Sequence, residues 1–91
     1  MSRVRYAINE KEVTFRVLDD GAVLVHCETG YYYTLNATGT FVWEMLVERE
    51  MTVIELADEL ARAFGQDPQG VAADVQHLLD HLRGENLILT R

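Results

Sequence analysis

The sequence predicts an α+β fold in which a three-stranded antiparallel β-meander is followed by three helices. Apolar residues alternate with a period of two up to residue 35, and after Asn36 they recur with a period near 3.6. Turn and capping residues separate these segments. Because strands come first, helices follow and the connections are short, we expect the helices to cover one face of the sheet.

The three expected strands are separated by two turns that contain glycine. Residues 13–18 (VTFRVL) alternate as in a half-buried strand. Residues 22–27 form a short apolar run typical of a buried middle strand, and residues 31–35 (YYYTL) form the third strand. Residues 19–21 (Asp-Asp-Gly) and 28–30 (Glu-Thr-Gly) supply the turns, where glycine can take a positive φ.

Capping residues mark the first two helices. Asn36 is expected to cap the first, because its side-chain oxygen can accept from the free amides of the first turn. Thr52 and Glu55 have the spacing of a capping box for the second, which Gly65 ends. The residues expected to face the core are Val42, Met45 and Leu46 in the first helix, with Phe41 and Trp43 at the margins, and Val53, Leu56, Ala57, Leu60, Ala61 and Phe64 in the second.

A third helix is expected after Asp67, which serves as its cap. Pro68 takes the first helical position, where its missing N–H is not needed, and Gly84 is the expected stop. The apolar stripe of this helix falls within about 60° of the helical circumference. It consists of Val71, Val75, Leu78 and Leu82.

The 91 residues are expected to form one domain, since a chain of this length can bury one modest core. Residues 1–12 are the expected N-terminal arm and residues 13–35 the sheet. Residues 36–84 hold the three helices, and residues 85–91 form a C-terminal tail that can include a short extended piece.

The net charge of −7 is unevenly distributed. Residues 1–16 hold four basic and two acidic side chains, whereas residues 17–91 hold four basic and thirteen acidic ones. An acidic body repels phosphate backbones, so nucleic acid is a poor default partner.

Three observations favour a reducing cytoplasm. The chain has a single cysteine, its first ten residues (MSRVRYAINE) contain no secretory signal, and no apolar run approaches the roughly 18–20 residues that cross a bilayer. We therefore expect neither an internal disulfide nor a membrane association.

Candidate chemical groups are few, and the chain is expected to be neither an enzyme nor cofactor-dependent. His77 and His81 have the i,i+4 spacing of metal ligands, and His26 is a further candidate, but two histidines on a helix flank are expected to be solvated. Cys27 lies in the expected middle strand with no catalytic motif around it. It is therefore expected to be a small buried apolar residue rather than a nucleophile.

The two helices joined by residues 65–67, with a sheet alongside, resemble a winged helix-turn-helix. A DNA-binding regulator is therefore the alternative function. Its recognition helix should present basic or amide side chains to base edges. Residues 68–83 instead carry Asp74 and Asp80 against Arg83, so the charge argues against DNA.

The tyrosine run on the third strand is the strongest candidate for a binding site. Tyr31 and Tyr33 share one face of the strand, and Tyr32 and Thr34 share the other. An outer strand of a meander normally carries charge, proline or a bulge that prevents further pairing, and residues 31–35 have none of these. Such an edge can capture an extended peptide by strand addition, and it can also pair two copies of the chain as a homodimer.

The strings ETGYYYTLNATGTFVWEML and TVIELADELARAFGQDPQGVAADVQHLLDHLRGENLI resemble the pyrroloquinoline quinone biosynthesis protein D (PqqD) family. More broadly they are similar to RiPP precursor-peptide recognition elements, which include the leader-binding proteins of lasso-peptide pathways. The resemblance covers about residues 13–89. The features that carry it are the Gly30 turn with its aromatic strand, Leu35 and Asn36 entering a helix with Gly39 and Trp43, the Thr52 helix start, and Asp67 before a long helix.

The resemblance implies a non-catalytic peptide chaperone. It would bind the leader of a ribosomally synthesised precursor peptide as an added strand and present it to a modifying enzyme, such as a radical SAM maturase or a leader peptidase. The implied docking edge is Tyr31, Tyr32, Tyr33 and Thr34, and the implied helical wall is Val71, Asp74, Val75, Leu78 and Leu82.

Several points stay open at this stage. Val71, Val75 and Leu78 are equally compatible with a plain core role. Asp74 and His81 lie on one shoulder of the stripe and Leu79 on the other, and the sequence does not say which shoulder faces the peptide. An acidic shoulder would suit a leader that bears lysine or arginine. The peptide, the partner enzyme and the final product are not specified.

Overall fold

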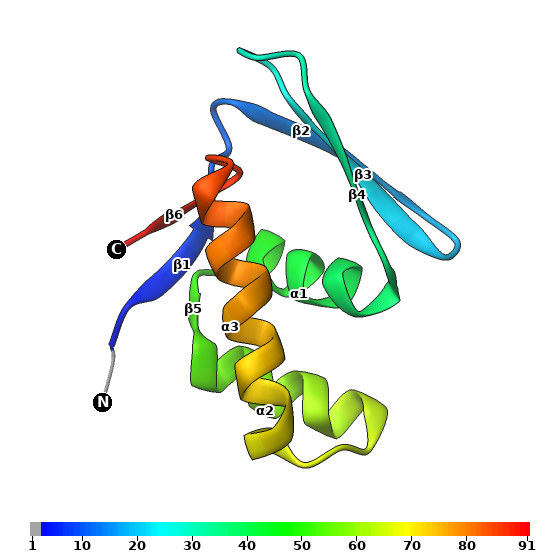
Figure 1. Ribbon diagram of the computed structural model, residues 1–91, viewed down its shortest axis with the longest axis vertical. Helices are drawn as coiled ribbons and strands as arrows, with labels where there is room; N and C mark the ends of the chain where they lie inside the picture. The colour runs from blue at the N-terminus through cyan, green and yellow to red at the C-terminus, as the bar shows by residue number, and fades with distance from the viewer. Residues whose placement is uncertain (1–2) are drawn as a thin grey trace.

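Two small antiparallel sheets and three helices make up the computed structural model, which describes residues 3–91 (Figure 1). The elements are β1 (Arg5–Ile8), β2 (Val13–Leu18), β3 (Gly21–His26), β4 (Tyr32–Leu35), α1 (Ala37–Glu48), β5 (Met51–Thr52), α2 (Val53–Phe64), α3 (Pro68–Gly84) and β6 (Ile88–Thr90). One sheet has the strand order β2-β3-β4 and the other β5-β1-β6. The predicted α+β fold is confirmed.

The predicted meander corresponds to the sheet β2-β3-β4. Each strand pairs with the next in antiparallel register, so that Phe15 faces Leu24 and Leu24 faces Tyr33. β3 ends at His26, and the chain then turns through Gly30, which has a φ of 77°. Cys27 therefore lies in the turn and is exposed. The expectation that it is a buried apolar residue is wrong, because the strand ends one residue earlier than expected.

The second sheet, β5-β1-β6, is not predicted from the sequence. In place of an N-terminal arm, residues 5–8 form the central strand β1, and Tyr6, Ala7 and Ile8 are buried. β6 occupies part of the expected tail and pairs with β1. A four-residue strand has little local signal, and its partners come from much later in the chain.

The three expected helix starts are confirmed by their caps. The Asn36 side chain accepts from the Gly39 N–H at 2.8 Å, and Thr52 forms a complete capping box with Glu55. Asp67 accepts from the N–H of Gln69 at 3.0 Å ahead of Pro68. Gly65 ends α2 in the left-handed region, with a φ of 66°. α3 includes Gly84, and Glu85 is its C-cap.

The aromatic residues of the two first helices differ from expectation. Trp43 was predicted at the margin of α1, but its side chain is fully buried, and Phe15 of β2 contacts it edge-on with ring centroids 5.7 Å apart. The sheet β2-β3-β4 packs over that side of α1, so the buried part of the helix circumference is wider than its apolar stripe. Phe64 was predicted to face the core but is 48% exposed, because it lies at the end of α2 against Phe41.

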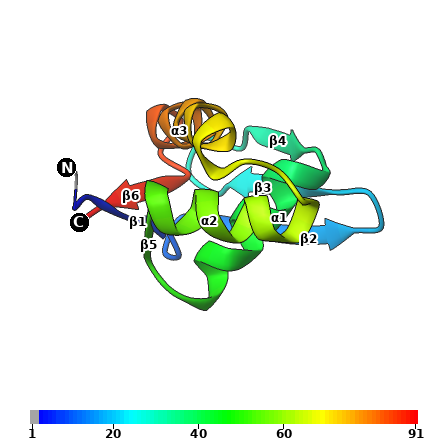
Figure 2. The same ribbon diagram turned by 90° about the horizontal axis from the view of Figure 1, so that it is seen from below.

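α3 is rotated slightly from its expected orientation. It packs against α2 and β6, and its fully buried residues are Val71, Val75, Leu79 and Leu82. Leu78 is only partly buried. The shoulder of Leu79 therefore faces the core, and the opposite shoulder is free to face β4. Figure 2 shows α3 and β4 on the same side of α1.

Gly21 is expected to be essential for the placement of β4. A Cβ built at Gly21 would lie 2.3 Å from the carbonyl oxygen of Leu35, which is backbone and cannot swing away. Gly21→Ala should lower the free energy of unfolding by about 1–3 kcal/mol, measured by urea denaturation. The control is Gly70→Ala in α3, where nothing lies within 4 Å and alanine should stabilise by about 0.4–1 kcal/mol. Equal midpoints for the two variants would contradict this role of Gly21.

Glu55 is expected to make the fold sensitive to acid. The N–H of Thr52, and then the side chains of Arg49 and Thr52, lower the pKa of the Glu55 carboxyl below its ordinary value. A lowered pKa contributes stability above about pH 4.5 that is lost as the pH falls. Glu55→Gln should therefore reduce the loss of urea resistance between pH 6 and pH 3, relative to the control Glu48→Gln. An unchanged pH dependence in Glu55→Gln would show that the capping carboxylate has no such role.

Candidate functional site

β4 is an edge strand with one free side. It pairs with β3 only, and within residues 3–91 no strand lies against its other side. It carries no charged residue and no proline over Tyr32–Leu35. The backbone of β4 is therefore available to pair with an additional strand.

The register shows which backbone groups point outward. The N–H of His26 donates to the carbonyl of Tyr31 at 2.9 Å. Backbone groups of an antiparallel strand point to the neighbouring strand at every second residue. Tyr33 and Leu35 therefore bond to β3, whereas Tyr32 and Thr34 direct their N–H and C=O groups to the free side.

The side chains of the tyrosine run alternate as predicted but meet different surroundings. Tyr33 lies on the inner face, opposite the fully buried Leu24. Its hydroxyl donates to Glu85 Oε2 at 3.0 Å, which ties β4 to the end of α3. Burial and the Glu85 carboxylate raise the pKa of the Tyr33 phenol above its ordinary value, so it remains a donor. Tyr31 and Tyr32 are 67% and 72% exposed.

Two hollows lie near β4 and α3, one between α1, α2 and α3 just beyond the end of β4, and one beside β4 at the C-cap of α3. The first has a volume of about 320 Å³ and is lined by Asn36, Thr38, Gly39, Val42, Leu60, Asp74, Val75 and Leu78. The second has a volume of about 430 Å³ and is lined by Gly30, Tyr31, Tyr32, Tyr33 and Glu85. We call the surface that these residues form the β4–α3 groove. α3 and β4 run in opposite directions along it, as Figure 1 shows.

The structure places the predicted helical wall in two settings. Asp74 and Leu78 line the first hollow, and Val75 contributes to it from the buried side of the helix. Val71 and Leu82 are buried in the core, at 5% and 2% exposure, and line neither hollow.

The structure also shows which side of α3 faces the groove, a point that the sequence left open. Leu79 is fully buried, so the shoulder that carries Asp74 faces the groove. Glu85 was not among the predicted site residues, although it follows Leu78 by seven residues and so lies on the same side of α3. The seven-residue spacing from Leu78 could have identified Glu85 as a site residue from the sequence. Leu60 and Thr38 had no comparable signal, because α2 and α1 reach the groove only through tertiary packing.

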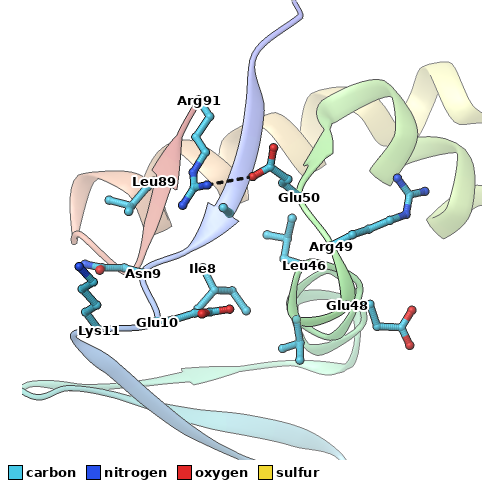
Figure 3. A pocket seen from close by; sticks show the side chains of 12 residues that line it. Ile8, Asn9, Glu10, Lys11, Leu46, Glu48, Arg49, Glu50, Leu89 and Arg91 are labelled. Carbon is cyan, nitrogen blue, oxygen red and sulfur yellow. Dashed lines mark ion pairs between the residues drawn. The ribbon is translucent and has the colours of Figure 1, made fainter.

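A separate hollow of about 460 Å³ lies between β1, the end of α1 and the C-terminal strand (Figure 3). Its charged lining consists of Glu10, Glu48, Glu50, Lys11, Arg49 and Arg91, three acidic and three basic side chains. Arg91 pairs with Glu50 at 3.2 Å. The charges of this hollow are balanced, which distinguishes it from the β4–α3 groove.

The described residues contain no evident metal centre. Residues 3–91 have no cluster of three or more His, Cys, Asp or Glu side chains placed to hold an ion. His77 and His81 are both exposed, and His26 is buried with its Nε2 3.5 Å from a Glu12 carboxylate oxygen. Over the same residues, each helix falls short of the length and apolar character needed to cross a membrane.

Two solved structures are similar to this chain. The first is described as TbiB1 in complex with the TbiA(beta) leader peptide, with a TM-score of 0.82, 29% sequence identity, and coverage of 90% of this chain and 93% of that chain. The second, a lasso peptide synthetase B1 complexed with the leader peptide, has a TM-score of 0.79 and 20% identity, and covers 92% of this chain and 96% of that one. It shares the fold. A comparison with curated proteins gives no match.

The family described as Coenzyme PQQ synthesis protein D (PqqD) matches residues 21–88. The matched segment includes β3, β4 and all three helices, and hence both sides of the groove. Because it spans well over half of the sequence and agrees with the fold, the chain belongs to the PqqD family.

Proposed function

We propose that this protein is a non-catalytic carrier of a ribosomally synthesised precursor peptide. The leader of that peptide adds as a strand to the free side of β4, and the protein presents it to a modifying enzyme. The observation that carries the proposal is the unpaired edge of β4, with one hollow beside it at the C-cap of α3 and a second hollow just beyond its end, where α3 meets α1 and α2. The similarity to TbiB1, which is described in complex with a leader peptide, supports it.

Affinity and specificity come from different parts of the groove. The outward N–H and C=O groups of Tyr32 and Thr34 pair with the peptide backbone whatever its sequence. Specificity comes from peptide side chains that enter the hollows, since alternate residues of an added strand face α3. The peptide-contacting set is Tyr31, Tyr32, Tyr33, Thr34, Asp74, Val75 and Leu78. Val71 and Leu82 contribute from the core by holding α3 in place.

The charge of α3 disfavours the winged-helix DNA-binding alternative. This helix would be the recognition helix, and it carries Asp74 and Asp80 against the single Arg83. The chain as a whole has a net charge of −7. Both features oppose a phosphate backbone and suit a peptide partner.

The partner enzyme in this proposal is a maturase of the radical SAM class or a leader peptidase, acting in the cytoplasm where the precursor is synthesised. A homodimer that pairs two β4 edges would occupy the same backbone groups as the peptide. Peptide binding and such a dimer are therefore mutually exclusive in this scheme.

Removing one outward backbone donor should weaken peptide binding. Tyr32→Pro deletes an N–H that points to the free side of β4, and we expect the Kd for a labelled leader peptide to rise about tenfold. Tyr32→Phe keeps the donor and should bind within about twofold of the wild type. Binding is measured by fluorescence anisotropy, with circular dichroism to verify folding. Equal affinities of the two folded variants would contradict strand addition at β4.

Duplex DNA should not bind. In a gel-shift assay at about 50 mM salt, where electrostatic binding to DNA is strong, we expect no retarded band at micromolar protein. A band that disappears steeply as salt is added would instead favour the regulator.

A further inference from the structure

The charged side chains that line the two hollows of the β4–α3 groove are carboxylates. Asp74 lies in the first hollow and Glu85 in the second, and neither hollow has a lysine or arginine in its lining among the described residues. The hollow of Figure 3, by contrast, has equal numbers of acidic and basic side chains. The groove therefore presents a negative potential to an incoming peptide.

The Glu85 hollow combines a carboxylate with aromatic surfaces. Tyr33 donates one hydrogen bond to Glu85 Oε2, which leaves most of the acceptor positions of that carboxylate unused. Tyr31 lines the same hollow, shares the strand face of Tyr33, and is 67% exposed. A carboxylate next to exposed aromatic rings is an arrangement that binds ammonium and guanidinium groups.

From this arrangement we infer that the hollow formed by Tyr31, Tyr33 and Glu85 binds a lysine or arginine side chain of the added strand. The first hollow, lined on its buried side by Val42, Leu60 and Val75, takes an apolar side chain of the same peptide. The inference rests on the proposed function and specifies the class of leader: an extended segment with one apolar and one basic residue directed toward α3.

The geometry also constrains the spacing of these two residues. Leu78 and Glu85 mark the two hollows along α3 and are seven residues apart, which corresponds to about 10 Å. Side chains on one face of an extended strand recur about every 6.7 Å. The basic residue therefore lies two or four positions from the apolar one, and an odd spacing directs it away from Glu85.

The test uses labelled, end-capped, threonine-rich peptides of about twelve residues. The first peptide has one leucine with lysines two and four positions from it, the second has glutamines at those two positions, and the third has both lysines shifted by one position. Anisotropy titrations are made at pH 8. Two protein variants test the subsite: Glu85→Gln and Tyr31→Leu. Glu85→Gln keeps an oxygen that can accept from the Tyr33 hydroxyl. The control is Glu48→Gln, which changes a carboxylate in the hollow of Figure 3.

We expect the wild type and Glu48→Gln to bind the lysine peptide about three- to tenfold more tightly than the other two peptides. Glu85→Gln should reduce this preference to less than about twofold, and Tyr31→Leu should reduce it in part. Equal affinities of the wild type for the three peptides, or an unchanged preference in Glu85→Gln, would overturn the cation subsite and leave strand addition intact. Failure of all three peptides to bind at about 1 mM would count against strand addition itself, because backbone pairing does not depend on sequence.

Discussion

The free side of β4 is the constraint on which the proposed function depends. A strand pairs with two neighbours, and β4 has one, because the meander ends there and the chain continues directly into α1. α3 approaches this edge from the inner side but packs against α2 and β6 rather than against β4. The result is a strand with an unpaired edge, one hollow beside it at the C-cap of α3 and a second hollow just beyond its end.

The separation between β4 and α3 is maintained by contacts at both ends of the strand. At its start, the Tyr33 hydroxyl donates to Glu85 and links the sheet β2-β3-β4 to the C-cap of α3. At its end, the carbonyl of Leu35 lies so close to Gly21 that a side chain there would displace it. The position of Glu85 depends in turn on the second sheet, since Asn9 donates to the carbonyls of Asn86 and Leu87 just beyond α3. The small sheet β5-β1-β6 thus contributes to the groove without lining it.

The charged side chains are distributed differently over the hollows of the surface. The groove contributes carboxylates, which suit a peptide with a basic residue, whereas the hollow beside β1 has balanced charges. The two exposed tyrosines, Tyr31 and Tyr32, point to opposite faces of β4. In the proposed complex, one of them would therefore face the peptide side chains, and the other would remain on the opposite face of the sheet.

The sequence by itself determined the features that local chemistry controls. The period-two pattern located the meander, Asn36, Thr52 and Asp67 marked the helix starts, and the uncharged tyrosine run identified an edge strand. Tertiary structure decided the features that depend on distant partners. β1 becomes a strand only because β5 and β6 pair with it, and Trp43 is buried because Phe15 covers it. The orientation of α3 was likewise settled by packing, since Leu78 and Leu79 are equally apolar and only contact with α2 and β6 selects Leu79 for burial. Caps and strand patterns involve residues a few positions apart, whereas a groove is formed by surfaces that meet only after the chain has folded.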